Sequence, residues 1–187
     1  MRRNILHLGV GKDWEEIYER RDREHDHLIF VDKSLGSEVS KYGPDIHTCG
    51  IIEYLEGYNR KDIDSVVAQR VFEHFDYKDL PYLLYSIWLI CRPEATLSIT
   101  VPDFNLVSEE VKTLNAEKMK AQVFNNMMIQ CHTEVFNEPS DPHRSIWTKN
   151  LAEYYLTLED YWSVNSIDHM TLDGRPWYLY ILATAIK

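Results

Sequence analysis

The sequence has few cysteines, and the ones present are far apart. Its 187 residues include three, Cys49, Cys91 and Cys131, with no Cys-x-x-Cys pair. An odd number at such spacing does not support a disulfide framework, and it does not provide a structural zinc knuckle. We therefore expect buried thiols at all three positions.

Long hydrophobic runs and an excess of basic residues are also missing. No stretch reaches the roughly 18 apolar residues of a membrane span, and the first residues lack the features of a secretory signal. We therefore expect a cytoplasmic protein that does not enter membranes. Thirty acidic residues against twenty basic ones give a net charge of -10, which opposes binding to nucleic acid. A small or neutral substrate suits this charge better.

Glycine is scarce, and its distribution is uneven. Six of the seven glycines lie within the first 57 residues. Gly9 and Gly11 directly follow the apolar run "ILHL", and glycine lets the backbone turn sharply and come close to a ligand. The pattern predicts a ligand-binding loop in the first part of the chain.

What the chain does contain is a regular alternation of apolar strands and helical stretches. Strands are expected at 4–9, 28–31, 45–49, 64–69 and 95–104, and helices at 14–23, within 76–93, at 106–129 and at 148–158. A hairpin is expected over 161–187, with its turn at Asp173-Gly174. The predicted fold is a doubly wound, mostly parallel, seven-stranded α/β sheet with helices on both faces and a C-terminal antiparallel hairpin. One domain, 1–187, accommodates a single core.

An ordered set of motifs runs along this alternation. The motifs are Gly9-x-Gly11 after the first strand, Asp32 at the end of the second, "VFEHF" after the fourth, "RP" before the fifth, "TVPD" at its end and "DPHRSIWT" before the last helix. Together with the hairpin, the set resembles a class I S-adenosylmethionine-dependent methyltransferase, of the small type 11 kind. The resemblance implies a Rossmann-like fold, S-adenosylmethionine as cofactor, and methyl transfer to an oxygen or nitrogen of a small molecule or sugar.

The resemblance also assigns residues to the cofactor. It places Gly9, Gly11 and Val71 beside it. Asp32 follows the loop by about 20 residues at a strand end, where a carboxylate can accept hydrogen bonds from both ribose hydroxyls. The alternative for Asp32 is an ordinary turn or helix-cap aspartate.

Five residues depart from the family's pattern. His7 replaces an acidic residue, Asp13 a third small residue, Ile51 an adenine-contacting Asp or Asn, and Glu94-Ala95 two glycines. Asp13 matters most, because a carboxylate capping the helix repels the carboxylate of the cofactor at a cost on the order of 1 to 2 kcal/mol. Glu53 either replaces part of the contact near Ile51 or lies in solvent. We expect weakened cofactor binding.

Histidines after the fourth strand and before the last helix are candidates for proton transfer. The sulfonium is already a good leaving group, so the protein must mainly orient the acceptor and, for a hydroxyl, remove a proton. His74 and His143 are the candidate bases, and Glu73 could orient one of them. The alternatives are a surface histidine at 74 and a turn-stabilising role with Asp141 for His143.

No metal ion is predicted. Cys131 and His132 with His143 give neither the right spacing nor a fourth ligand.

The aromatic residues of the C-terminal part could pack in the core or line a pocket. The hairpin leaves a sheet edge through which a homodimer could form.

Two other functions remain open beside methyl transfer. The altered loop suggests a methyltransferase fold that binds a partner or nucleoside without turnover. A nicotinamide-dependent dehydrogenase shares the Gly9-x-Gly11 and Asp32 spacing. Its fingerprint needs a third glycine at the position of the bulky Trp14, which favours the methyltransferase.

Overall fold

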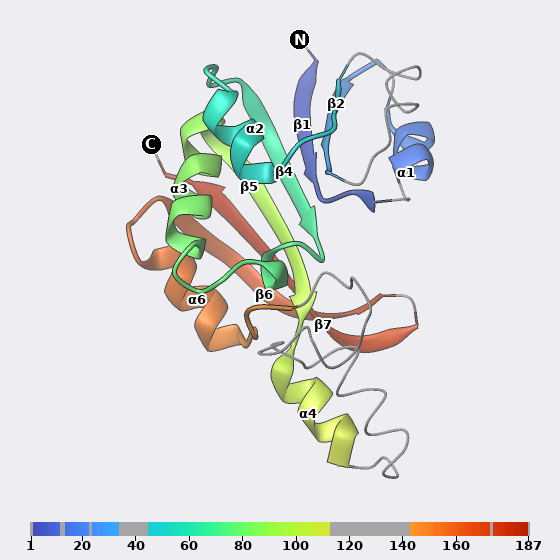
Figure 1. The fold of residues 1–187 in the computed structure, drawn as a ribbon, viewed down its shortest axis with the longest axis vertical. Helices are drawn as coiled ribbons and strands as arrows, with labels where there is room; N and C mark the ends of the chain where they lie inside the picture. Colours follow the sequence, from blue (N-terminus) through green and yellow to red (C-terminus); the bar gives the residue numbers. More distant parts are fainter. Residues whose placement is uncertain are drawn as a thin grey trace.

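The computed structural model describes residues 2–11, 14–22, 24–33, 45–112, 143–172 and 174–186. The strands are β1 (Arg3–Leu8), β2 (Asp26–Val31), β3 (Ile46–His47), β4 (Ile63–Gln69), β5 (Cys91–Pro102), β6 (Trp162–Leu172) and β7 (Arg175–Ala185). The helices are α1 (Trp14–Arg20), α2 (Ile51–Gly57), α3 (Leu80–Ile90), α4 (Phe104–Lys112) and α6 (Lys149–Thr157), and η3 (Phe72–His74) is a single 3₁₀ turn. Figure 1 shows their arrangement.

All seven strands belong to one sheet, in the order β3-β2-β1-β4-β5-β7-β6. The pairs among β1 to β5 are parallel, whereas β7 is antiparallel to both β5 and β6. This confirms the predicted sheet and its terminal hairpin. The strand order reverses between β1 and β4, which puts the topological switch point at the carboxyl ends of these two strands.

Side chains of β2 alternate between two packed layers, as the twofold period of a strand requires. Ile29 and Val31 join the large core, which also contains buried residues of α2, α3 and α6. Leu28 and Phe30 form a second cluster, against which Ile17 of α1 packs. Helices therefore cover both faces, and Figure 1 shows α1 on the opposite side of the sheet from α2, α3 and α6.

Helix α3 packs against the sheet through apolar residues at helical spacing. Pro81 occupies its first turn, where the missing N–H group costs nothing. The buried positions include Leu83, Leu84 and Ile87. Burying each such side chain contributes roughly 1.5–3 kcal/mol, so this helix fixes the position of the segment before it, which carries η3.

Several element boundaries differ from the predictions. Helix α2 was not predicted, because seven residues are too short to show a clear helical period. The predicted 45–49 strand has two residues, and the first helix ends at Arg20. Strand β5 begins at Cys91, immediately after α3, which is four residues earlier than the predicted start at 95. Of the predicted 106–129 helix, only the part within α4 lies in the described residues.

Other predictions fall outside the described residues. These are the helix cap at Asp13, the turn before His143, and the positions of Cys131, His132 and Asp173. Of the remaining cysteines, Cys91 is buried as expected, whereas Cys49 is only half-buried. Among the described helices, none combines the length and the apolar character needed to cross a membrane.

Candidate cofactor and acceptor site

The glycine loop after β1 takes a conformation that suits glycine. Gly9 and Gly11 have φ angles of +64° and +55°, in the left-handed region. A Cβ atom at Gly9 would lie 2.4 Å from Cγ2 of Val71, which is closer than atoms can approach. The loop therefore packs directly against the end of β4, and Val71 supports the loop with a buried side chain.

Asp32 and the glycine loop meet at the carboxyl end of the sheet. The Gly11 N–H donates to Oδ2 of Asp32 at 2.7 Å. The Asp32 N–H in turn donates to the carbonyl oxygen of His47 at 3.1 Å, which fixes the residue between β2 and β3. The carboxylate of Asp32 therefore lies directly beside the backbone of the glycine loop. The predicted loop and carboxylate therefore form one unit.

Glu53 lies in the first turn of α2 and is exposed. Its Oε2 accepts a long hydrogen bond, 3.4 Å, from the Gly50 N–H, so the side chain caps the helix. Burial, followed by the charge of Glu53, raises the pKa of the neighbouring Cys49 thiol. Glu53 therefore brings a negative charge to the end of β3, where the adenine contact was predicted.

The chain leaves β4 through a strained turn. Arg70 has a φ of +56°, unusual for a residue with a side chain. Its N–H donates to the Thr100 carbonyl of β5 at 2.8 Å, which holds this conformation. The turn directs Val71 toward the glycine loop and begins η3, in which Glu73 is buried at 1% exposure and His74 is half-buried.

Residues 143–148, called the strap here, run over η3. The Arg144 and Ser145 amides both donate to the carbonyl oxygen of Glu73, at 2.6 and 3.1 Å. Trp147 is fully buried and anchors the strap in the core. These contacts join two parts of the chain about 70 residues apart in sequence.

Tyr77 gives the strap a second attachment. Its hydroxyl donates to the Ile146 carbonyl at 3.1 Å and accepts from the Ile146 N–H at 2.8 Å. Farther along, the Phe104 N–H donates to the Trp147 carbonyl at 2.8 Å. The strap is thus bound to the segments that follow β4 and β5.

The strap brings the three predicted catalytic residues together. Glu73, His74 and His143 place one nitrogen or oxygen atom each within 4.8 Å of one another. The two imidazole rings lie 5.1 Å apart, edge to face at 85°. We call these residues the Glu-His-His cluster. All three were candidates from the sequence, and the structure places His143 of the strap beside Glu73 and His74 of η3.

A second histidine–carboxylate pair at the same sheet edge was not predicted. Nε2 of His169 lies 2.8 Å from Oδ2 of Asp103, which is 2% exposed. The other oxygen of Asp103 accepts from the Asn105 N–H at 2.9 Å. A carboxylate held in this way can orient an imidazole for proton transfer. The "TVPD" motif was a signal for Asp103, but nothing in the sequence connects it to His169 in the hairpin.

His7 stands on β1, at the position where the family pattern has an acidic residue. Its ring packs against Phe30, with 5.3 Å between ring centroids. Burial lowers the pKa of His7 to about 4, so its imidazole is neutral at physiological pH. This position contributes packing rather than charge.

No protein-family model and no curated protein sequence matches this chain. Solved structures do match it. A S-adenosylmethionine-dependent methyltransferase from Methanosarcina mazei has a TM-score of 0.67 at 12% identity, covering 99% of this chain and 93% of its own. One from Archaeoglobus fulgidus has a TM-score of 0.61 at 14% identity, covering 98% of this chain and 86% of its own.

A third structure includes bound ligands. It is the 1,6-didemethyltoxoflavin-N1-methyltransferase of Burkholderia thailandensis with 1,6-didemethyltoxoflavin and S-adenosylhomocysteine. Its TM-score is 0.63 at 13% identity, covering 100% of this chain and 72% of that chain. This chain has the class I methyltransferase fold. Because the match extends over essentially all of this chain, the sheet and the hairpin both belong to that methyltransferase fold.

Proposed function

We propose that the chain transfers a methyl group from S-adenosylmethionine to an oxygen or nitrogen of a small molecule or sugar. The observation that carries the proposal is the hydrogen bond between Gly11 and Asp32, 2.7 Å long, at the switch point of a methyltransferase fold. Ligands bind at such switch points because helices and loops diverge there. A structure with this fold holds S-adenosylhomocysteine, the demethylated form of the cofactor.

On the cofactor side, the backbone at Gly9 and Gly11 comes close to the methionyl part of the ligand. Val71 supports the loop from below, as its contact with Gly9 indicates. Asp32 accepts hydrogen bonds from the ribose hydroxyls, and Glu53 lies beside the adenine. These five residues are the cofactor contacts predicted from the sequence, and Glu53 has the additional role of capping α2.

On the acceptor side, the Glu-His-His cluster supplies the proton-transfer groups. His74 removes the acceptor's proton, Glu73 orients it, and His143 completes the wall of the site from the strap. The pair of His169 and Asp103 is a competing base, because its carboxylate is buried and its imidazole is partly accessible. The two candidates make different predictions for single substitutions.

Cofactor binding is tested by titration calorimetry with S-adenosylhomocysteine. We expect saturable micromolar binding, and Asp32→Ala should weaken it about tenfold or more through the loss of the ribose contacts. Asp32→Asn keeps an oxygen that can accept from Gly11 and should lose less. Asp26→Ala is the matched control, since Asp26 begins the same strand and pairs with Arg3 at the opposite end. An absence of heat at millimolar ligand would contradict the proposal.

Catalysis is tested by transfer of a labelled methyl group into a small-molecule extract. His74→Ala should reduce transfer by roughly 10²-fold or more while leaving cofactor affinity unchanged. If His169→Ala has that effect and His74→Ala does not, the base is His169.

The second candidate function is a methyltransferase fold that binds a nucleoside or partner without turnover. His7 and Ile51 favour it, because neither supplies the polar contact of the family pattern. Binding of S-adenosylhomocysteine without any methyl transfer would support this candidate.

We further propose a cytoplasmic protein that does not bind nucleic acid. Its exposed edge strand β6 allows a homodimer, which light scattering would detect.

A further inference from the structure

The Glu-His-His cluster has the donor set of a metal site. Two imidazole nitrogens and one carboxylate oxygen form the three-ligand arrangement of many catalytic zinc and non-haem iron centres. In this chain the three donor atoms lie within 4.8 Å of one another. We propose that Glu73, His74 and His143 bind one divalent transition-metal ion, for which Zn²⁺ is the best-suited probe.

The geometry needs only a small adjustment to close around an ion. Tetrahedral zinc holds nitrogen and oxygen ligands at about 2.0–2.1 Å, so two of its donor atoms lie about 3.3 Å apart. His74 and His143 are both half-buried. We expect rotations about their side-chain bonds to supply the remaining movement from within 4.8 Å to about 3.3 Å.

Burial favours a cation at this place. Glu73 is 1% exposed, and with His143 it lines a cavity of about 10 Å³, close to the room that one water molecule needs. The other walls of this cavity include Phe104, Val107 and Trp147. A positive charge near a buried carboxylate interacts with it more strongly than it would in water.

The strap positions the ligands before any ion arrives. The two amides that follow His143 in the chain, those of Arg144 and Ser145, both donate to the backbone oxygen of Glu73. The Ser145 hydroxyl also donates to the Phe72 carbonyl at 3.2 Å. The ligand from the strap and the ligands from η3 are therefore tied together by backbone contacts, which lowers the entropy that metal binding must overcome.

Within the described parts of the chain, this is the single group of at least three such side chains close enough to share an ion. No metal ion was predicted from the sequence, because Cys131 and His132 with His143 do not form a complete ligand set. The proposed ligands come from two segments, and only the folded chain brings them together.

Three protein ligands leave a coordination position open. If the proposed methyl transfer holds, that position suits the acceptor oxygen, and the ion would lower the pKa of a coordinated hydroxyl. The hydroxyl proton would then pass to solvent, and His74 would serve as a ligand rather than as the base. This consequence rests on the proposed function, whereas the metal site itself does not.

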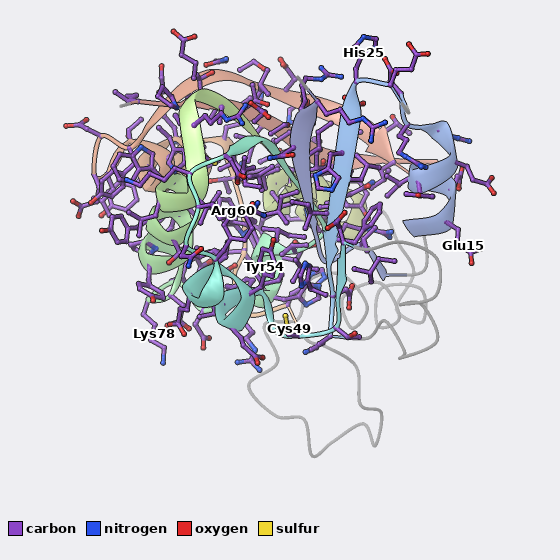
Figure 2. The ribbon with its side chains drawn as sticks, turned by 90° about the horizontal axis from the view of Figure 1, so that it is seen from above. Glu15, His25, Cys49, Tyr54, Arg60 and Lys78 are labelled. Atoms are coloured by element: carbon purple, nitrogen blue, oxygen red, sulfur yellow. The ribbon has the colours of Figure 1, made fainter. Side chains whose placement is uncertain are left out.

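The test is calorimetry of Zn²⁺ with the tag-free, chelator-treated full chain. We expect one ion per chain with micromolar or tighter affinity, and Glu73→Gln or His143→Ala should weaken it about tenfold or more. His25→Ala is the matched control. His25 also pairs with a carboxylate, that of Asp22, but it precedes β2 and therefore lies at the edge of the sheet opposite to the cluster. Figure 2 shows His25 on the far side of the molecule from Cys49, which follows β3 at the carboxyl edge.

A second measurement covers variants that fold poorly. Zn²⁺ should raise the unfolding temperature of the parent chain and of His25→Ala, and it should leave that of His143→Ala unchanged. The proposal is overturned if submillimolar Zn²⁺ gives no binding, or if the cluster variants bind as tightly as the parent chain. Calorimetry with S-adenosylhomocysteine in the presence of chelator tests the proposed function separately, so the two can fail independently.

Discussion

His7 is a partly buried histidine, and it makes the stability of the fold depend on pH. Burial lowers its pKa from 6.5 to about 4 in the folded chain. Between these two values the unfolded chain binds a proton that the folded chain does not, so the free energy of unfolding falls as the pH is lowered through this window. Above pH 6.5 His7 is neutral in both the folded and the unfolded chain, so its titration takes nothing from the free energy of unfolding. The loss at acid pH amounts to at most about 3 kcal/mol.

Urea unfolding at pH 7.5 and at pH 4.5 measures this effect. We expect His7→Leu to remove a large part of the difference in unfolding free energy between the two conditions, because leucine does not titrate. His25→Leu, at an exposed histidine, should leave the difference nearly unchanged. An equal pH dependence in the parent chain and in His7→Leu would show that other groups cause it.

Glu94 holds a left-handed backbone at a place where the family pattern has glycine. Its φ is +65°, its side chain is exposed, and the pairing of β5 with β4 shifts register around it. We expect Glu94→Gly to raise the free energy of unfolding by roughly 0.5–1 kcal/mol, since glycine adopts this conformation without strain. Glu94→Ala is the control and should give no gain, because alanine keeps the Cβ atom. Stabilisation by alanine as large as by glycine would exclude backbone strain as the cause.

Residues whose position follows from a strand end could be located from the sequence. Gly11 and Asp32 each follow an apolar run, and parallel strands bring such residues to one edge, where the two do form a hydrogen bond. The contact between His169 and Asp103 could not be predicted in this way. It depends on the register of the hairpin against β5, which the sequence does not specify.

The strap is an element without regular structure, and Tyr77 is one of its main attachments. Tyr77→Phe removes both a donor and an acceptor from the Ile146 backbone, which is partly buried, and we expect a cost of about 1–3 kcal/mol in unfolding free energy. Tyr82→Phe is the matched control, because that hydroxyl contacts Glu56 at an exposed position and should cost much less. Urea denaturation compares the two.

The same substitution also tests the proposed metal site. A looser strap holds His143 less firmly, so Tyr77→Phe should weaken Zn²⁺ binding, whereas Tyr82→Phe should not. Unchanged stability in Tyr77→Phe would show that water replaces the hydroxyl and that the strap does not depend on it.

Elements with a strong local pattern were predicted, and those without one were not. The buried runs of β1, β2 and β4 and the apolar face of α3 each show their period over a sufficient length. Helix α2 has seven residues, and β5 starts directly where α3 ends. In both cases tertiary packing decides the boundary, so no local signal marks it.

At the scale of the whole molecule, alternation of strands and helices limited the fold to a few topologies, and the ordered motifs selected one of them. The strand order with its antiparallel β7 confirms that choice. Fold does not determine function, however, because the same architecture supports many sites. The proposed methyl transfer depends on the residues at the switch point, and the proposed metal site depends on the Glu-His-His cluster.

Ligand binding should stabilise the whole chain if the switch point is a cofactor site. A ligand that binds only the folded state, at about 100 times its dissociation constant, raises the free energy of unfolding by about 2.7 kcal/mol. We expect S-adenosylhomocysteine to do this in chelator for the parent chain and for His143→Ala, because neither depends on a metal ion to hold the nucleoside. Asp32→Ala should gain much less at the same concentration. If His143→Ala loses the stabilisation while Asp32→Ala keeps it, the ligand binds at the Glu-His-His cluster and not beside the glycine loop.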